Sequence, residues 1–558
     1  MPRELSRSQY AALYGPTAGD RVRLGDTSLW LRIERDLGEY GDEPLWGYAK
    51  NMRNGMMLAS RAPTDSELDL VIVGATVIDP VLGIFKGSIG IKDGRIVGIG
   101  NAGNPDIADN VDLVIGPGTN ATPGFGLIAT PGGIDSHVHF VSPRLVPVAL
   151  SGGVTTLIGA GLGHNPAFNL HVALEAMEGF PLNVGLQARA ATHERDALEP
   201  LIAAGACGFK VHEDYGAYPP VIDAALRVAD DLDVSVALHT DGLNEAIEVD
   251  ETVAAIAGRT VHAYHVEGTG GGHVPDVLML VREANVICSS TTPTIPYGTH
   301  TADEHLEMIL GVHGMSHAIP EDVSAALERV RPTTMAAEDL LHEMGAISIV
   351  NSDSQGMGRI GETVRRTWQL ADANKQRSAE ATGEGDDNAR ILRYIAKYTI
   401  NPARTHGIAA HVGSLEPGKL ADIVLWRPAF FGAKPETVIK GGVVAWTLLG
   451  EGNASIGRVE PVTYGAAWGA TGAAPPRIAA TFVSQLSLDS GVQRQVRSAR
   501  QFLPVHGCRG LTKHDLVMND ATPAIEVDPA TGRVFLDGAE LTCAPAREFA
   551  LNRRYFLS

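Results

Sequence analysis

The stretch TPGGIDSHVHF, residues 130–140, decides the predicted fold, because a strand-like apolar run ends there and two histidines follow it. His137 and His139 are two residues apart. On an extended strand end, residues i and i+2 point the same way, so both imidazoles can reach one metal ion. We place this motif just after the first strand of a barrel, a strand that we expect to end near Thr130. The motif is short, so this interpretation depends on the rest of the chain.

Seven more apolar runs follow, and helix-like stretches separate most of them. Eight strands that alternate with helices predict an α/β fold of the (β/α)8 TIM-barrel type, whose active site lies at the carboxyl ends of the strands. The seven later strands are expected to end near the following residues: Ile158, Leu186, Lys210, His239, His265, Ser289 and Asp353.

Two β-rich segments flank the predicted barrel. Residues 69–100 contain short β-branched runs, and Asp93-Gly94 lies between two of them as a hairpin turn would. Residues 413–426 have similar chemistry. We therefore predict a flanking β-sandwich domain formed by both ends of the chain. The expected units are residues 1–130 for its N-terminal part, 131–412 for the barrel, 413–480 for its returning part and 481–558 for a C-terminal α/β extension.

The composition predicts a globular protein with an acidic surface. Hydrophobic residues make up 44% and charged residues 20% of the 558 residues, which excludes wholesale disorder. Lys+Arg number 45 and Asp+Glu 65, so the net charge is −20 and the surface repels nucleic-acid phosphates and anionic membranes. The 4 cysteines form no Cys-x-x-Cys pair, and we find neither an apolar leader nor a long apolar run. We expect a cytoplasmic protein with no nucleic-acid or membrane partner. Residues 371–390 are expected to form a solvated loop.

Histidines are concentrated in the predicted barrel, where 15 of the 19 lie between His137 and His342. Imidazoles, a lysine and a carboxylate at strand ends suit two divalent cations that hold a hydroxide as nucleophile near neutral pH. These ligand types permit Zn, Ni, Mn or Fe and do not choose among them. The expected ligands are His137, His139, Lys210, His239, His265 and Asp353.

Lys210 would face a cavity lined with histidines, where a buried ammonium is costly. The amine could stay neutral, or it could react with CO2 to give a carbamate that bridges two cations. The side chain could also extend to solvent. Its position leaves these alternatives open. His262 and His273 are expected to be a core residue and a loop or supporting residue, rather than ligands.

Longer strings give the chain a specific resemblance. The histidine, lysine and aspartate pattern is typical of the amidohydrolase superfamily, and within it the chain resembles the urease alpha-subunit family nearly end to end. The strings that carry the resemblance are YGPTAGDRVRLGDTSLW from Tyr14, GFKVHEDYG, LHTDGLNE, HVEGTGGGHVPD, AAEDLLHEMGA, SDSQGMGRIGE and YIAKYTINPARTHGIA.

The resemblance implies a role for each expected ligand. Lys210 would be an N6-carboxylysine that bridges two Ni²⁺ ions. His239 and His265 would complete one nickel site. The other nickel site would be completed by His137, His139 and Asp353.

The resemblance also implies residues that handle the substrate. His212 is similar to the histidine that hydrogen-bonds the substrate carbonyl oxygen. His313 matches the flap histidine that acts as general acid for the leaving ammonia. Asp214 and Arg329 match the pair that positions this histidine.

Three departures from the family pattern lie on the substrate-facing side. Val312 and Gly314 stand where the family flap has a cysteine and a second histidine. The loop within residues 157–172 is shorter than the family's, and Gly356 replaces an alanine. None of these departures removes an expected ligand or His313.

The resemblance implies nickel-dependent hydrolysis of urea to ammonia and carbamate by the catalytic alpha subunit. The implied partners are urease beta and gamma subunits in a heterotrimer of trimers, and nickel-loading accessory proteins. One alternative is an amidohydrolase of the same scaffold that acts on another ureido or amide substrate. Another is a non-catalytic paralogue, although a complete ligand set argues against it.

Overall fold

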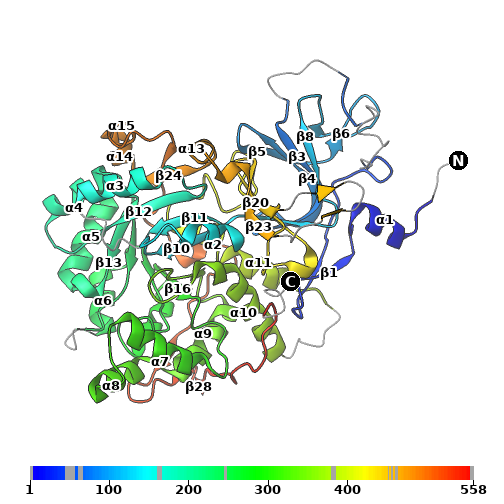
Figure 1. The fold of residues 1–558 in the computed structure, drawn as a ribbon. Helices are drawn as coiled ribbons and strands as arrows, with labels where there is room; N and C mark the ends of the chain where they lie inside the picture. The colour runs from blue at the N-terminus through cyan, green and yellow to red at the C-terminus, as the bar shows by residue number, and fades with distance from the viewer. Residues whose placement is uncertain are drawn as a thin grey trace.

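A computed structural model gives the structure and describes residues 4–43, 57–60, 67–159, 166–243, 248–378, 385–449, 452–453, 457–458 and 463–552. Eight parallel strands follow one another in chain order around a nearly closed barrel, with helices on the outside (Figure 1). The expected α/β barrel is therefore confirmed. Its strands are β10 (Gly133–Val138), β11 (Val154–Gly159), β12 (Asn183–Arg189), β13 (Gly208–Val211), β14 (Ser235–Leu238), β15 (Val261–Ala263), β16 (Val286–Thr291) and β17 (Ile349–Asn351).

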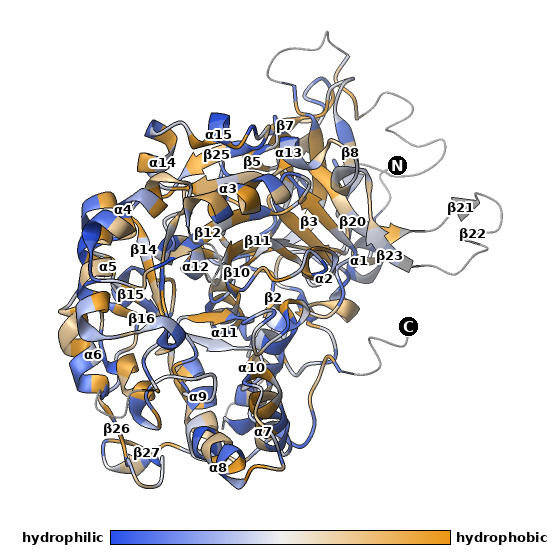
Figure 2. Cartoon of the chain, turned by 60° about the vertical axis from the view of Figure 1, so that its left-hand side comes forward, coloured by the Kyte–Doolittle hydropathy of each residue, from blue (hydrophilic) through white to orange (hydrophobic). Residues whose placement is uncertain are grey.

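Amphipathic helices cover the barrel. In α5 (Pro219–Leu232), proline occupies the first turn, and the helix ends at Asp233, whose φ of 49° leaves the helical region. Its buried side chains recur three or four residues apart and face the strands, whereas its polar residues face outward. Figure 2 shows hydrophobic residues along the strands and mixed colours on the outer helices. The other helices around the barrel are α2 (Leu145–Ser151), α3 (Ala167–Ala176), α4 (Arg195–Ala203), α6 (Val249–Ile256), α9 (Pro332–Met344), α10 (Thr363–Arg377), α11 (Asn388–Ala396) and α12 (Ile400–Thr405).

A nine-stranded mixed sheet flanks the barrel and is built from both ends of the chain, as expected. Asp93 and Gly94 have φ values of 49° and 74° and form the predicted hairpin turn between β4 and β5. The strands are hydrogen bonded as a single sheet. They are β3 (Leu70–Asp79), β4 (Gly83–Lys92), β5 (Arg95–Gly100), β8 (Asn120–Pro123), β9 (Ile128–Pro131), β18 (Ile423–Trp426), β19 (Thr437–Lys440), β20 (Val443–Leu449) and β23 (Thr463–Ala466).

The strand that ends near Thr130 belongs to this flanking sheet and not to the barrel. Thr130 lies opposite Val424 in the antiparallel pair of β9 and β18. A side chain at Gly132 would collide with Thr155, so glycine lets the chain cross closely from one sheet to the other. The first barrel strand begins only at Gly133, and His137 lies inside it.

The expected solvated loop at 371–390 is also wrong in its described part. Residues 371–377 are the last turns of α10, and residues 379–384 lie outside the described residues. Asp372 accepts hydrogen bonds from the backbone and hydroxyl of Ser28, both at 2.6 Å. Lys375 lies 2.7 Å from Asp387. The polar residues are therefore paired inside the protein rather than solvated.

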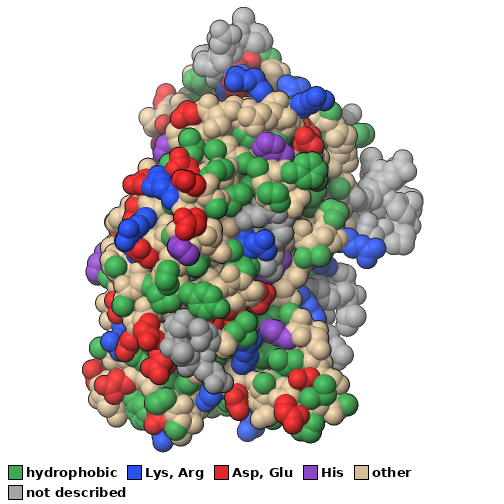
Figure 3. Space-filling model, turned by 90° about the vertical axis from the view of Figure 1, so that its left-hand side faces the viewer, with side chains coloured by type: hydrophobic (Ala, Val, Ile, Leu, Met, Phe, Trp, Pro, Cys, Tyr) green, Lys and Arg blue, Asp and Glu red, His purple; other side chains and the backbone are tan. Residues whose placement is uncertain are grey.

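The C-terminal extension is hydrogen bonded to the barrel. Strand β24 (Ala480–Val483) pairs in parallel with β12, and β25 (Gln501–Pro504) pairs with β24. The buried Arg500 donates to the carbonyl oxygens of Phe180 and Leu182 at 2.7 Å each. None of the described helices has both the length and the apolar character needed to cross a membrane. Figure 3 shows acidic side chains spread over one face, in line with the net charge of −20.

Candidate metal centre

The barrel brings the six expected ligands to the carboxyl ends of its strands. Lys210 lies in β13, His239 directly follows β14, and His265 lies two residues beyond β15. The remaining three lie at the seam between β10 and β17. All six side chains are buried. We call His137, His139, Lys210, His239, His265 and Asp353 the strand-end cluster.

The seam that closes the barrel assembles one half of this cluster. The backbone N–H of His139 donates to Ser354 at 3.0 Å, and Val138 forms a parallel bridge with Ser354. Asp135, inside β10, accepts the backbone N–H groups of His137 at 3.2 Å and Ser352 at 3.1 Å. Burial raises the pKa of Asp135 to about 6. Asp135 thus ties the first barrel strand to the segment after the last.

A carboxylate lies between two imidazoles at this seam. Asp353 Oδ1 is 2.8 Å from His139 Nε2 and 3.2 Å from His137 Nε2. One ligand atom from each residue lies within 4.8 Å of the others, which is the spacing of a metal site. Burial acts to raise the pKa of Asp353, but the hydrogen bond from His139 and the nearby His265 and Lys210 lower it overall.

The other half of the cluster consists of His239, His265 and Lys210. The rings of His239 and His265 are 4.4 Å apart, and the rings of His137 and His265 are 5.7 Å apart, so the two halves adjoin. Lys210 Nζ lies 3.7 Å from the ring centre of Tyr264. Burial lowers the pKa of Lys210 well below its usual range, and a neutral amine is the favoured form there.

The protonation and the unpaired atoms of the cluster fit divalent cations. Burial, with neighbouring positive charges, lowers the pKa of His137 and His239 well below the usual range, and burial lowers that of His265 to about 4. Neutral imidazoles are the form that binds metal. Within the described residues, Lys210 Nζ, His137 Nδ1 and His265 Nδ1 are buried without a hydrogen-bond partner. Buried polar atoms rarely stay unpaired, so this donor set fits a metal pair.

Strained backbone aims two of the ligands. His265 has a φ of 34° and Asp353 a φ of 57°, in the left-handed region that residues other than glycine seldom occupy. Such strain concentrates at functional sites, where it is maintained by the surrounding structure. Here it turns each side chain inward just after its strand has ended.

Glycines form a wall against the imidazoles. A Cβ on Gly271, whose φ is 119°, would lie 2.5 Å from His239 Nε2, and one on Gly270 would lie 2.7 Å from His265 Cγ. His273 in the same loop bonds to Thr252 Oγ1 at 2.8 Å, as expected of a residue that supports the loop. The string HVEGTGGGHVPD therefore packs its backbone directly against the cluster.

His212 is placed to donate a hydrogen bond beside the cluster. Its ring lies 3.9 Å from that of His239, and its Nδ1 accepts the backbone N–H of Asp214 at 3.1 Å. Burial lowers the pKa of His212, so its imidazole is neutral. With Nδ1 as acceptor, the proton lies on Nε2, which can donate to a ligand oxygen.

Two helices form a lid-like unit that carries His313. We call residues 301–329, which contain α7 (Thr301–Val312) and α8 (Pro320–Arg329), the flap. His313 follows the last residue of α7; its Nδ1 donates to the carbonyl of Ile309 at 2.9 Å, and its Nε2 lies 3.3 Å from Arg329 Nη1. Since arginine only donates, Nε2 accepts. Asp214 instead lies near His212, with Oδ2 3.7 Å from Nδ1.

Sequence reasoning missed Glu213. This buried carboxylate lies in the 3-10 turn η1 (Glu213–Tyr215) directly after β13. Its Oε1 is 3.0 Å from His239 Nε2 and 3.2 Å from Arg329 Nη2. Alternation along the strand places Lys210 and His212 on the same face, so it predicts only His212 at the site. The turn brings Glu213 to the site as well. A second acid inside the string GFKVHEDYG was the available signal.

The departures from the family pattern have different surroundings. A Cβ on Gly356 would lie 2.5 Å from Asp353 Oδ1 and 2.9 Å from His139 Nε2, so the family's alanine would press on two ligands. Val312 is half exposed on the flap, and Gly314 has a φ of 65°. In the shorter loop, residues 160–165 lie outside the described residues.

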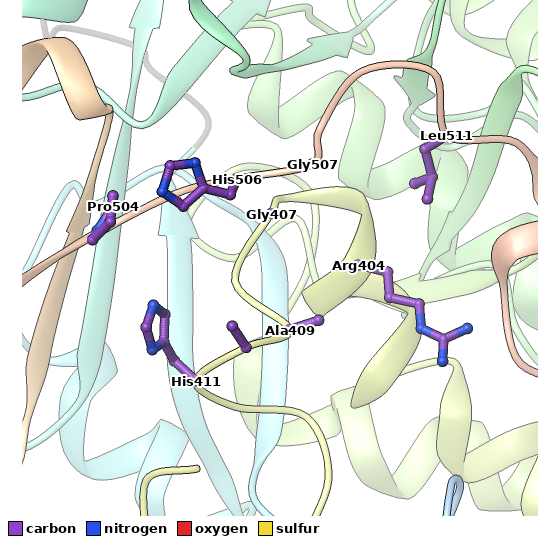
Figure 4. A pocket seen from close by; sticks show the side chains of 9 residues that line it. Arg404, Gly407, Ala409, His411, Pro504, His506, Gly507 and Leu511 are labelled. Carbon is purple, nitrogen blue, oxygen red and sulfur yellow. The ribbon is translucent and has the colours of Figure 1, made fainter. Parts of the chain in front are cut away.

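A cavity of about 160 Å³ lies apart from the cluster (Figure 4). His411 and His506 are among the residues that line it. His406, next to the cavity's Gly407, bonds to Ser235 at the start of β14, so the cavity is at the opposite end of the barrel. The two features are therefore separate.

Comparison with known proteins identifies the family. The sequence model of the amidohydrolase family matches residues 128–455, more than half of the chain. The chain belongs to the amidohydrolase family. The model of the urease alpha-subunit N-terminal domain also matches residues 3–122 of this amidohydrolase. The two matches bear out the resemblance to a urease alpha subunit within the amidohydrolase superfamily.

A solved structure shares the fold of this amidohydrolase. It is similar to D-hydantoinase (dihydropyrimidinase) from Thermus sp., with a TM-score of 0.50, 18% identity, and coverage of 67% of this chain and 95% of that chain. Dihydropyrimidinase from Brevibacillus agri has a TM-score of 0.49 at 15% identity, covering 67% of this chain and 94% of that chain. At such identity the likeness to the Thermus enzyme is one of fold.

Proposed function

We propose that this amidohydrolase hydrolyses urea to ammonia and carbamate as the catalytic alpha subunit of a urease, with two nickel ions in the strand-end cluster. The observation that carries the proposal is a buried lysine with an unpaired amine among neutral imidazoles and one ionised carboxylate. The urease-type N-terminal domain at 3–122 supports the choice of urea and nickel within the family.

Lys210 would become a bridging ligand by reaction with CO2. Burial leaves the amine neutral, so its lone pair can attack the carbon of CO2. The N–C bond forms, one C=O π bond opens, and the nitrogen loses a proton to solvent. The resulting carbamate would be an anion whose two oxygens could bind the cations.

Divalent cations bound there would supply Lewis acidity towards the carbonyl and a water of lowered pKa. The residues around them orient the substrate. His212 would donate from Nε2 to the carbonyl oxygen, and its Nδ1 contact with Asp214 holds that tautomer. The glycine wall at Gly270 and Gly271 leaves little room for water behind the imidazoles.

His313 would deliver the proton to the leaving nitrogen. In the present geometry, its Nε2 accepts from Arg329, and its Nδ1–H is committed to the Ile309 carbonyl. The acid role therefore requires Arg329 to turn away while Nε2 takes up a proton. We interpret the observed contact as the resting state of the flap.

A larger ureido or amide substrate is the second candidate. Val312 is half exposed, and Gly314 carries no side chain. The side chains at these two flap positions are therefore smaller or less polar than the family's cysteine and second histidine. The family's cysteine and second histidine would narrow the entrance and add polar contacts. Without these two side chains, we expect a substituted urea to be accommodated.

The test is metal analysis together with ammonia release, on protein produced with nickel-loading accessory factors. We expect two nickel ions per chain and ammonia from urea. Nickel-loaded protein that hydrolyses N-substituted ureas or cyclic amides but not urea would favour the second candidate. Protein that takes up no metal under these conditions would contradict both and favour a non-catalytic paralogue.

The partners follow from the same proposal. We propose that beta and gamma subunits join this chain in a closed assembly with three copies of each, because cyclic symmetry is the common solution for such complexes. Co-expression with beta and gamma chains, followed by native mass measurement, tests this. Full activity from a strictly monomeric chain would contradict it.

A further inference from the structure

Glu213 is held rigidly between the barrel and the flap. Its side chain is 3% exposed, and Oε2 accepts the backbone N–H of Gly242 at 2.7 Å. A Cβ on Gly242 would lie 3.0 Å from Oε2, and one on Gly271 would lie 2.9 Å from Oε1. Backbone therefore surrounds the carboxylate on two sides and fixes its position.

One oxygen of this carboxylate serves two partners. Oε1 is 3.0 Å from His239 Nε2 and 3.2 Å from Arg329 Nη2. The other nitrogen of the same guanidinium, Nη1, is 3.3 Å from His313 Nε2. A continuous line of contacts therefore runs from the strand-end cluster through Glu213 to the flap.

The two contacts of Oε1 compete. The contact with His239 has the distance of a hydrogen bond but not its alignment, whereas the contact with Arg329 meets both criteria. A carboxylate near Nε2 favours the tautomer with the proton there, which leaves the Nδ1 lone pair for a cation. A cation on the ring makes the Nε2 proton a stronger donor, so it binds Oε1 more tightly and weakens the hold of Oε1 on Arg329.

We propose that Glu213 is a positioning residue that couples metal binding at His239 to release of the flap through Arg329. This inference rests on the metal site of the proposed function, but not on the substrate. Without metal, Glu213 holds Arg329, and Arg329 holds His313. With metal, Glu213 aligns His239, and the guanidinium becomes free to leave Nε2 of His313.

The test uses the full-length chain, Ni²⁺ alone as the probe, and two measurements. Hydrogen exchange of residues 301–329 is followed with and without Ni²⁺, and the Ni²⁺ dissociation constant is measured by competition with a chelator. In the unmodified protein we expect Ni²⁺ to speed exchange in the flap severalfold. Glu213→Gln should exchange fast even without metal, should no longer respond to Ni²⁺, and should bind Ni²⁺ about 10–100-fold more weakly.

Two further variants separate this role from a structural one. Glu307→Gln removes an exposed flap carboxylate that lies 3.1 Å from His317, and should behave like the unmodified protein in both measurements. Arg329→Gln should speed flap exchange but change the Ni²⁺ affinity little. If Glu213→Gln does not fold, Glu213→Asp keeps the charge and shortens its reach, and should shift both measurements in the same direction.

The inference is overturned if Glu213→Gln leaves metal-free flap exchange unchanged, or if its flap still responds to Ni²⁺. Urea is absent from these assays, so a chain that hydrolyses another amide leaves the inference intact. Failure of the unmodified chain to bind Ni²⁺ would contradict the proposed function, while the metal-free exchange of Glu213→Gln would still decide whether Glu213 holds the flap.

Discussion

The strand-end cluster and the flap contribute different parts of the proposed chemistry and are built in different ways. The cluster is buried, lies at the ends of hydrogen-bonded strands, and includes strained residues such as Asp353. His313 is exposed at the end of a helix and is held by one carbonyl oxygen and one arginine. Groups that must keep a fixed geometry are placed at the ends of barrel strands, whereas the group that must move is placed at the end of a helix in the flap.

Lys210→Ala should have the largest effect and should act on the cluster alone. It removes the bridging anion and leaves two cations about 3.5–4 Å apart without the negative charge that offsets their mutual repulsion. We expect loss of bound metal and of activity, while flap residues exchange as they do in the metal-free unmodified protein. Metal content and turnover are measured with and without formate, a small carboxylic acid that can fill the gap and partly restore both. Normal metal content in this variant would exclude a bridging role.

His313→Ala should have the next largest effect and should act through the flap alone. Loss of a general acid typically lowers the rate by about 10²–10⁴-fold. We expect kcat to fall by this amount while the KM and the metal content change little, since His313 touches no member of the cluster. Steady-state kinetics with metal analysis measure both. Turnover close to that of the unmodified enzyme would show that another group supplies the proton.

Acid should destabilise the metal-free protein through the buried imidazoles of the barrel. Burial sets the pKa of His265 to about 4 and that of His406 to about 3, below the value of about 6.5 in the unfolded chain. The unfolded chain binds more protons in this window, so stability is full above pH 6.5 and falls as the pH drops towards 4. Each group contributes at most about 1.4 kcal/mol per pH unit. Calorimetry should show a lower Tm at pH 5 than at pH 7; equal values would contradict neutral burial.

Gly356→Ala should perturb the cluster by a smaller amount. The new Cβ would lie 2.5 Å from Asp353 Oδ1, so at least one ligand has to move. We expect metal affinity to fall about 10-fold, as for other changes that disturb ligand orientation. Gly179→Ala is the matched control, because nothing lies within 4 Å of a Cβ there. Equal Ni²⁺ affinity in both variants would mean that the backbone at the seam adjusts to the new side chain without displacing a ligand.

Thiol reagents should have the smallest effect. Burial raises the pKa of Cys207 to about 12 and that of Cys543 to about 11, so neither forms much thiolate near pH 7. The flap carries Val312 where the family has cysteine. Val312→Cys should therefore create sensitivity to a maleimide that the unmodified enzyme lacks. Inactivation of the unmodified enzyme at a flap residue would show that this segment has been aligned wrongly with the family.

The barrel and the positions of its expected ligands could be predicted from the sequence, because parallel strands bring their carboxyl ends to one rim. The strand boundary at Thr130 could not, since one apolar run serves two sheets that are separated by Gly132. Polar residues such as Lys375 were expected to be solvated, because the sequence does not show that Lys375 pairs with Asp387, 12 residues later. Glu213 was missed because a 3-10 turn, rather than strand alternation, brings it to the site.

Anomalous X-ray scattering at the nickel edge, from crystals of nickel-loaded protein, tests the central claim most directly. The claim is that the strand-end cluster holds a pair of metal ions bridged by modified Lys210. We expect two anomalous peaks, one beside His137, His139 and Asp353 and the other beside His239 and His265, with carbamate density on Lys210 between them. A single peak, peaks elsewhere, or an unmodified lysine would contradict the account.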